Sequence, residues 1–252
     1  TIKNKGNSDQ VQLVSVWLSA EKVQFSQVQI ASKTNEIKAI PELLDTIDCE
    51  GSTITIDAIA SQRSITEKII EKKADYLIGL KSNQGSLFEQ VSDWLRSRKT
   101  TLPSFIEIDK DHGRGEIRST YVCEDLHFLE ETYEWSGLRS IVMTECRRIV
   151  DGKETTSERF YISSLSGTKP EQYAKLVRDH WSIENNLHWH LDVTFREDQS
   201  TVWKKNGPAN LSIVRKFALF LLSKEESKIS LKRKRKKAAR SNVFLKKIIK
   251  NA

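Results

Sequence analysis

Four ionisable side chains recur at intervals of four residues in one segment of this chain, at His180, Glu184, His188 and Asp192. The segment 173–192 holds no Gly or Pro, and its apolar residues are spaced for one face of a single helix. On such a helix the four side chains stack beside the apolar seam. Ionisable groups there are costly to bury unless they pair or bind something. The pattern therefore predicts a binding function, in which an acidic residue holds a metal ion against a phosphate.

A second carboxylate, Asp57, ends a β-branched run at 52–57 that predicts a buried strand. Ligands of open α/β sheets bind at the carboxyl ends of the strands. Asp57 and Glu184 together suit Mg²⁺ or Mn²⁺, which prefer oxygen ligands and can activate an oxygen nucleophile against phosphate. The alternative is zinc or iron held by His180 and His188, although their spacing is neither His-Glu-x-x-His nor the di-iron pattern.

Two further groups of polar residues have side chains suited to phosphates or base edges. They are Lys81, Asn83 and Gln84, which follow a predicted strand ending at Leu80, and His112, Arg114 and Arg118, which surround a pair of glycines. The first group either binds DNA or only caps the next helix. The second either contacts a DNA backbone or is an ordinary charged surface turn.

The first hundred residues alternate between strand and helix patterns. A hairpin is predicted from the alternating segments 11–18 and 23–30, strands at 52–57 and 75–80, and helices at 35–48, 64–73 and 84–98. Ser64 and Glu67 form a Ser-x-x-Glu capping box in the second helix. This order predicts a partly parallel sheet covered on both faces, which the hairpin makes mixed.

Residues 103–165 change to a β-rich pattern. Strands are predicted at 105–108, 117–122, 140–146 and 158–163, with Asp151-Gly152 as a hairpin turn. A last helix is predicted at 208–224, and the residues expected to face the core are Leu211, Val214, Phe217, Ala218 and Leu221.

Charge is unevenly distributed along the chain, whose formal net charge is +7. From Lys228 onward there are eleven Lys and Arg and no acid, so the remainder carries a net charge of −4. The densest run includes Lys232, Arg233, Lys234 and Arg235. This tail fits a polyanion partner, whose binding depends on salt, or it is simply solvated and partly disordered.

Other functional classes are disfavoured by composition. The 252 residues suffice for one large domain or two small ones, and no window approaches a membrane span. Three widely separated cysteines, Cys49, Cys123 and Cys146, argue against a disulfide framework and against thiolate zinc. They favour a reducing, cytoplasmic location.

The motifs, taken in order, resemble the bacterial insertion-sequence DDE transposases of the H-repeat-associated (ISAs) group. The resemblance spans nearly the whole chain. The residues that carry it are Thr53-Ile-Thr-Ile-Asp-Ala58 with Gln62, Leu80-Lys-Ser-Asn-Gln84, His112-Gly-Arg114 with Glu116 and Arg118, and the specific block from His180 to Asp198.

The resemblance implies an RNase H-like α/β fold, a mixed sheet flanked by helices with a β-rich insertion before the helix that carries Glu184. It implies that Asp57 is the second catalytic Asp and Glu184 the catalytic Glu, both holding Mg²⁺ or Mn²⁺. The first Asp is expected just before residue 1, so the chain resembles an N-terminally truncated enzyme. The implied domain limits are 1–102 and 169–226 for the core, 103–168 for the insertion and 227–252 for the tail.

The function that this resemblance implies is DNA transposition, by phosphodiester hydrolysis and strand transfer. The partners would be transposon ends and target DNA, with a homo-oligomer forming on DNA in the bacterial cytoplasm at the nucleoid, and no membrane. DNA contacts are expected from the Lys81, His112 and tail groups. The alternatives are a non-catalytic DNA-binding remnant and a metallohydrolase whose metal is held by His180 and His188.

Overall fold

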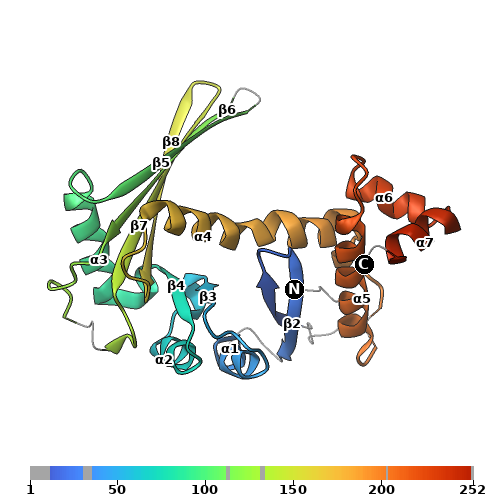
Figure 1. Cartoon of the computed structure of the whole chain (residues 1–252), viewed down its shortest axis with the longest axis horizontal. Helices are drawn as coiled ribbons and strands as arrows, with labels where there is room; N and C mark the ends of the chain where they lie inside the picture. Colours follow the sequence, from blue (N-terminus) through green and yellow to red (C-terminus); the bar gives the residue numbers. More distant parts are fainter. Residues whose placement is uncertain (1–11, 31–35, 112–113, 131–133, 203, 251–252) are drawn as a thin grey trace. The chain divides into compact units, whose positions relative to one another are not determined.

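The computed structural model describes residues 12–30, 36–111, 114–130, 134–202 and 204–250 (Figure 1). The chain divides into two compact units, one formed by residues 1–43 with 181–252 and the other by residues 44–180. Within the described residues, no helix is both long and apolar enough to cross a membrane. Cys49, Cys123 and Cys146 are free thiols.

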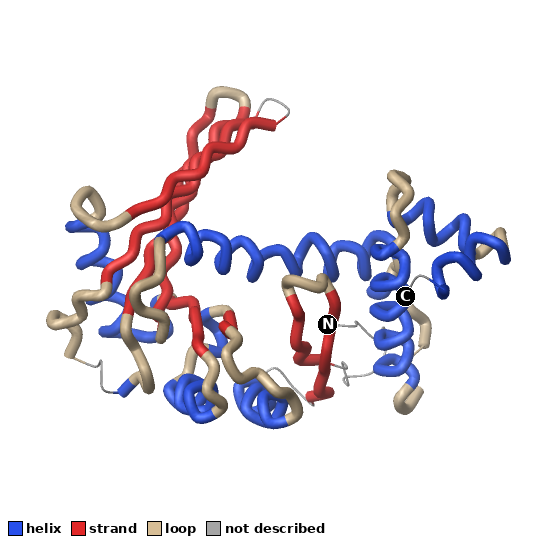
Figure 2. Tube along the Cα trace, viewed as in Figure 1, coloured by secondary structure: helices blue, strands red, loops and turns tan. Residues whose placement is uncertain are grey.

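The unit of residues 44–180 is built on a six-stranded sheet of order β3-β4-β8-β7-β6-β5 (Figure 2). Its first two strands, β3 (Thr53–Ile56) and β4 (Asp75–Leu80), run parallel. They are connected through α2 (Arg63–Glu71), because parallel neighbours need a crossover. Every other pairing is antiparallel. The predicted class, a mixed α/β sheet flanked by helices, is confirmed.

The β-rich region continues this same sheet, since β8 (Lys153–Ser163) pairs with β4. The remaining strands are β5 (Ser104–Asp111), β6 (Arg114–Cys123) and β7 (Ser140–Val150). The β7–β8 turn is Asp151-Gly152, as predicted, and both residues have positive φ. The far ends of β7 and β8 are exposed, and Figure 1 shows this ribbon projecting past the helices of the unit.

Helices cover the near half of the sheet. Within α3 (Gly85–Arg98), Phe88 meets Phe160 of β8 edge to face, and Leu87, Val91 and Leu95 are buried. Within α4 (Pro170–Ile183), Tyr173 is fully buried and its hydroxyl donates to the Leu165 carbonyl at 3.0 Å. Apolar residues of β4 are buried on both faces, as expected of an interior strand.

The other unit contains a hairpin, β1 (Gln12–Leu18) and β2 (Val23–Ile30), which pair with each other as a separate two-stranded sheet. The prediction that this hairpin belongs to the mixed sheet is wrong. The reason is that its apolar side packs elsewhere: Trp17 lies against a cluster of Leu187, Leu191 and Leu219. The polar contacts of β1 and β2 with Lys216 reinforce this packing.

The chain ends in three consecutive helices, α5 (Gly207–Lys224), α6 (Leu231–Ala238) and α7 (Asn242–Lys250). Leu222 of α5 packs with Phe244 and Ile248 of α7. Residues 231–238 and 242–250 are therefore helical, and α7 packs against α5. The predicted core face of α5 is partly wrong, because Val214 and Phe217 are about 60% exposed.

Candidate active site

Asp57 lies directly after β3, at the carboxyl end of a parallel strand, as the sequence predicted. Its Oδ1 accepts the N–H of Ala58 at 2.8 Å and caps a short 3-10 turn, Ala58–Ala60. The Asp57 side chain is 43% exposed. Within the described part of the chain, its Oδ2 accepts no hydrogen bond. One carboxylate oxygen is thus fixed by the fold, and the other can ligate a cation.

The Lys81–Gln84 segment follows β4, so parallel pairing brings it to the same sheet edge as Asp57. The Lys81 ammonium lies 3.4 Å from Asp57 Oδ1. The amides of Asn83 and Gln84 donate to the Ala58 carbonyl at 3.1 and 3.0 Å, and Gln84 Oε1 accepts the Lys81 backbone N–H at 2.8 Å. Asn83 and Gln84 therefore hold the Asp57 turn in place, which leaves the exposed Lys81 as the group able to meet a phosphate.

Gly79 of β4 allows this turn to lie close to the sheet. A Cβ added at Gly79 would stand 3.1 Å from the backbone nitrogen of Ala58. We expect Gly79→Val to lower the free energy of unfolding by about 1–3 kcal/mol through overpacking. Urea denaturation measures the change. The matched control is Gly115→Val on β6, whose added Cβ has an ordinary 3.9 Å contact with Ile149; equal stability of the two variants would contradict the close approach.

The helix α4 is tied to the strand that precedes Asp57. His180 Nδ1 lies 3.0 Å from Thr55 Oγ1 on β3. Earlier on the same helix, Arg178 forms an ion pair with Glu107 of β5 at 2.6 Å. These contacts join the two ends of the sheet to one helix. The sequence did not reveal the His180–Thr55 pair, because its residues are 125 positions apart.

Glu184 is exposed, and no ion pair or hydrogen bond engages its carboxylate among the described residues. It begins a π-helical turn, Glu184–His188, in which the Trp189 N–H bonds to the Glu184 carbonyl. A second π turn spans His190–Thr194. Such turns are rare and occur frequently at functional sites.

The predicted row of His180, Glu184, His188 and Asp192 runs through these π turns. Hydrogen bonds in them span five residues instead of four. His188 and Asp192 remain close enough for the charge of His188 to lower the pKa of Asp192, against larger effects that raise it. Among the described residues, no three His, Cys, Asp or Glu side chains lie together as a metal site.

Burial and acidic neighbours raise the pKa of Asp192. Desolvation is the largest cause, followed by the negative charges of Asp198 and Glu197. Desolvation also lowers the pKa of His190, whose Nδ1 lies 3.2 Å from Thr194 Oγ1. Both changes favour the neutral forms of these groups.

The β6 group of predicted DNA contacts is only partly described. Arg118 forms an ion pair with the buried Glu116 at 2.5 Å, and Glu116 also pairs with Arg148 at 3.4 Å. Arg118 thus neutralises a buried carboxylate of its own sheet. His112 lies outside the described residues, and for Arg114 only the backbone is described, as the first residue of β6. DNA contact by these residues stays a prediction.

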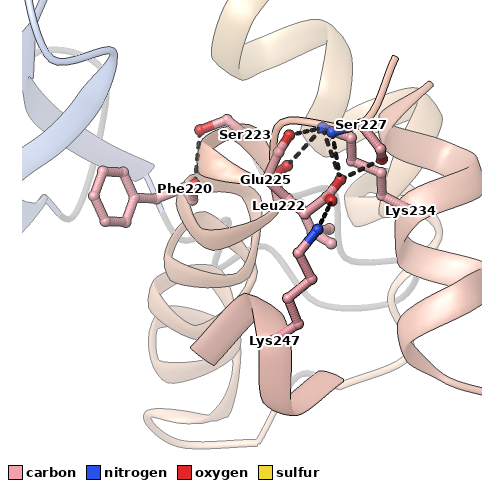
Figure 3. A network of polar contacts seen from close by, with 7 residues as sticks. All are labelled: Phe220, Leu222, Ser223, Glu225, Ser227, Lys234 and Lys247. Carbon is pink, nitrogen blue, oxygen red and sulfur yellow. Dashed lines mark hydrogen bonds and ion pairs between the residues drawn. The ribbon is translucent and has the colours of Figure 1, made fainter. Parts of the chain in front are cut away.

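In the tail, the prediction for Lys234 is wrong. Lys234 is 6% exposed, and its ammonium binds the carboxylate and carbonyl of Glu225 and, at 3.4 Å, the Leu222 carbonyl (Figure 3). A group held in this way is unavailable to a phosphate. Arg235 is half-buried over the Phe195 ring. Lys232 and Arg233, by contrast, are exposed.

Sequence reasoning also missed a partly buried lysine. Lys216 of α5 donates to Gln27 Oε1 at 2.9 Å and to Ser15 Oγ at 3.4 Å. It lines a pocket of about 60 Å³ with Trp17 and His190. Burial lowers the pKa of Lys216 to about 8, against the opposing effect of Glu197. The available signal was a basic residue inside the apolar helix pattern that precedes the tail.

Comparison with known proteins agrees with this architecture. Residues 10–221 match the family model described as "Transposase DDE domain". The chain is 34% identical over 244 residues to the H repeat-associated putative transposase YhhI of Escherichia coli K12, covering 93% of the chain and 64% of that protein. It is 37% identical over 247 residues to the putative transposase YncI of Escherichia coli O157:H7, covering 95% and 63%.

A third relative is the putative protein YbfL of Escherichia coli K12, 35% identical over 93% of the chain and 64% of that protein. The chain therefore spans a little under two thirds of the length of these relatives. Its mixed sheet with flanking helices is consistent with an RNase H-like fold. The family match and the H repeat-associated relatives together establish that this chain belongs to the transposase DDE domain family.

Proposed function

We propose that this chain is the catalytic domain of a DNA transposase, in which Asp57 and Glu184 jointly hold divalent cations. The observation that carries the proposal is the Asp57 turn: a half-exposed carboxylate, fixed at the carboxyl edge of the sheet, with one oxygen left for a ligand. Carboxylate oxygens are the ligands that Mg²⁺ and Mn²⁺ prefer. Glu184, exposed and unengaged among the described residues, supplies a second carboxylate of the same kind.

The reaction class that suits this site is phosphodiester hydrolysis followed by strand transfer. Bound Mg²⁺ or Mn²⁺ would polarise the phosphate and make an attacking oxygen more nucleophilic. The residues of the chain orient the reactants. Asp57 and Glu184 supply negative charge, and the Lys81 ammonium beside Asp57 attracts a phosphate oxygen. Water attacks first at the end of the element, and the freed 3′-hydroxyl then attacks target DNA in line.

Two further residues have positioning roles in this proposal. Asn83 and Gln84 place their amides on the Ala58 carbonyl and so hold the backbone that carries Asp57. We therefore assign them to the support of the carboxylate and not to DNA contact. The partners are transposon ends and target DNA, and joining two ends requires a homo-oligomer on the DNA.

A plasmid-nicking assay tests the proposal. Supercoiled DNA is incubated with the protein in Mg²⁺, in Mn²⁺, in Ca²⁺ and in a chelator. We expect nicking in Mg²⁺ or Mn²⁺ that the chelator abolishes. Nicking that persists in the chelator would contradict the metal-dependent mechanism. Binding of DNA with no nicking in either metal would instead support a non-catalytic DNA-binding protein.

A further inference from the structure

The basic tail presents different side chains on its two faces. Leu231, Lys234 and Ala238 are spaced by three and four residues, so they share one face of α6. Lys234 is buried, while Leu231 and Ala238 pack against the cluster formed by α5 and α7. The helix is thus fixed by one face. Its position is set by packing, although most of its residues are charged.

A buried carboxylate organises this packing. Glu225 follows α5 and is 3% exposed. It accepts hydrogen bonds from Ser227 and, at 3.1 Å, from Lys247 of α7, and it pairs with Lys234 of α6 (Figure 3). The Ser227 hydroxyl is the largest cause that lowers the pKa of Glu225 to about 2, with help from Lys247 and Lys234 against desolvation. We call Glu225, Ser227, Lys234 and Lys247 the Glu225 latch.

Other basic residues from Lys232 onward are exposed. No acid occurs from Lys228 to the end of the chain, so the outward charges lack neighbouring acids in sequence. Within the described residues they also form no ion pair. These exposed residues are Lys232, Arg233, Lys236, Arg240, Lys246 and Lys250. Two docked helices therefore carry an unneutralised positive face.

We propose that α6 and α7 form a platform that binds the phosphates of duplex DNA through these outward residues, and that the Glu225 latch is a positioning device for it. This inference rests on the proposed function and extends it. A latched pair of helices holds its cations at fixed separations, which suits the regular phosphates of a duplex. Simple attraction between a basic tail and a polyanion needs no such latch.

The decisive comparison is between Glu225→Gln and Glu226→Gln. Both changes remove one negative charge, but Glu226 is exposed and outside the latch. If net charge alone governs binding, both variants bind duplex DNA more tightly. If the latch positions the platform, Glu225→Gln binds about ten-fold more weakly despite its added positive charge, whereas Glu226→Gln does not weaken. Fluorescence anisotropy with a labelled random-sequence duplex, in a chelator and across a KCl series, measures both.

A second set of variants distinguishes the residues that contact phosphates from the latch that positions them. Replacing Lys232, Arg233, Lys236 and Arg240 by Gln is expected to reduce the slope of log K against log salt by about 3.6 if each contacts one phosphate, at about 0.9 per contact. Ser227→Ala keeps every charge and is expected to weaken binding two- to three-fold. Circular dichroism and hydrogen exchange report whether α6 and α7 stay helical and docked.

Several results would overturn the inference. These are tighter binding by Glu225→Gln, an unchanged salt slope after loss of the outward residues, or binding of anionic phosphatidylserine vesicles in preference to DNA. Because the assay omits divalent metal and scores no cleavage, its failure leaves the Asp57 and Glu184 proposal standing. Conversely, if Asp57→Asn and Glu184→Gln cleaved DNA at the unmodified rate, the catalytic proposal would fail while the DNA-binding platform would be unaffected.

Discussion

Replacing Asp57 by Asn is expected to lower the rate of metal-dependent DNA cleavage by about 10³-fold, equivalent to roughly 4 kcal/mol of activation free energy. The amide keeps an oxygen that can accept the Ala58 N–H, so the turn is preserved. It loses the negative charge that draws a divalent cation. Glu184→Gln is expected to cause a loss of similar size for the same reason. Single-turnover nicking rates at saturating Mn²⁺ give the comparison.

The control for this pair is Glu171→Gln, a change of the same chemistry at an exposed residue in the first turn of α4. We expect its cleavage rate to match that of the unmodified chain. Thermal melts of the variants establish that a lost rate is not lost folding. Full activity in either Asp57→Asn or Glu184→Gln would remove that residue from the catalytic set.

A second large effect is expected from Lys216, whose pKa of about 8 lies below the ordinary lysine value of 10.5. Below pH 8 the folded state holds this lysine charged in a desolvated site, and this penalty is fully present there. As pH rises from 8 to 10.5, the folded state releases its proton before the unfolded chain does. The free energy of unfolding should therefore rise by about 3 kcal/mol over this range from this residue alone.

Urea denaturation at several pH values, compared between the unmodified chain and Lys216→Met, isolates this contribution. Met cannot titrate, and Gln27 Oε1 keeps the hydrogen bond from the Gln24 amide. We expect the difference between the two curves to change by about 3 kcal/mol between pH 8 and 10.5. Lys224→Met, at an exposed lysine on the same helix, should leave the difference flat. A flat difference for Lys216→Met would contradict the desolvated state of the lysine.

Local patterns predicted the strands and most helices because their signals are short-range. The Asp151-Gly152 dipeptide specified a turn in which both residues have positive φ. The capping box at Ser64 was misassigned, since α2 begins at Arg63 and Gln62 is its N-cap without a side-chain bond. A local motif thus located the helix but missed its start by a residue.

Features that depend on distant partners were not predictable. Six consecutive basic residues give no sign that Lys234 has a buried carboxylate partner, Glu225, nine positions earlier. The π turns after Glu184 have no local sequence signature, so the sequence predicted one continuous α-helix through them. The exposed Phe217 shows a related limit. The apolar residues of α5 predicted an apolar helix face, but not whether another part of the chain packs on it.

The sequence predicted where Asp57 lies, but not the hydrogen bonds that hold its turn. Asp57 was placed at a strand end, and parallel pairing brings Lys81 beside it. The amides of Asn83 and Gln84 suit a base edge as well as a carbonyl, so the sequence did not distinguish DNA contact from support. Only the folded backbone shows that both amides meet the Ala58 carbonyl.

We propose that Asp57 and Glu184 share one cation, and metal-directed cleavage of the polypeptide tests this directly. Fe²⁺ loaded into this site, with ascorbate and peroxide, cuts the polypeptide close to the bound metal and needs no DNA. We expect cuts near residue 57 and near residue 184 that Mg²⁺ suppresses, with both cuts lost in Asp57→Asn and both lost in Glu184→Gln. Cutting near residue 57 that survives Glu184→Gln would show that the carboxylates do not share an ion, and would contradict the account.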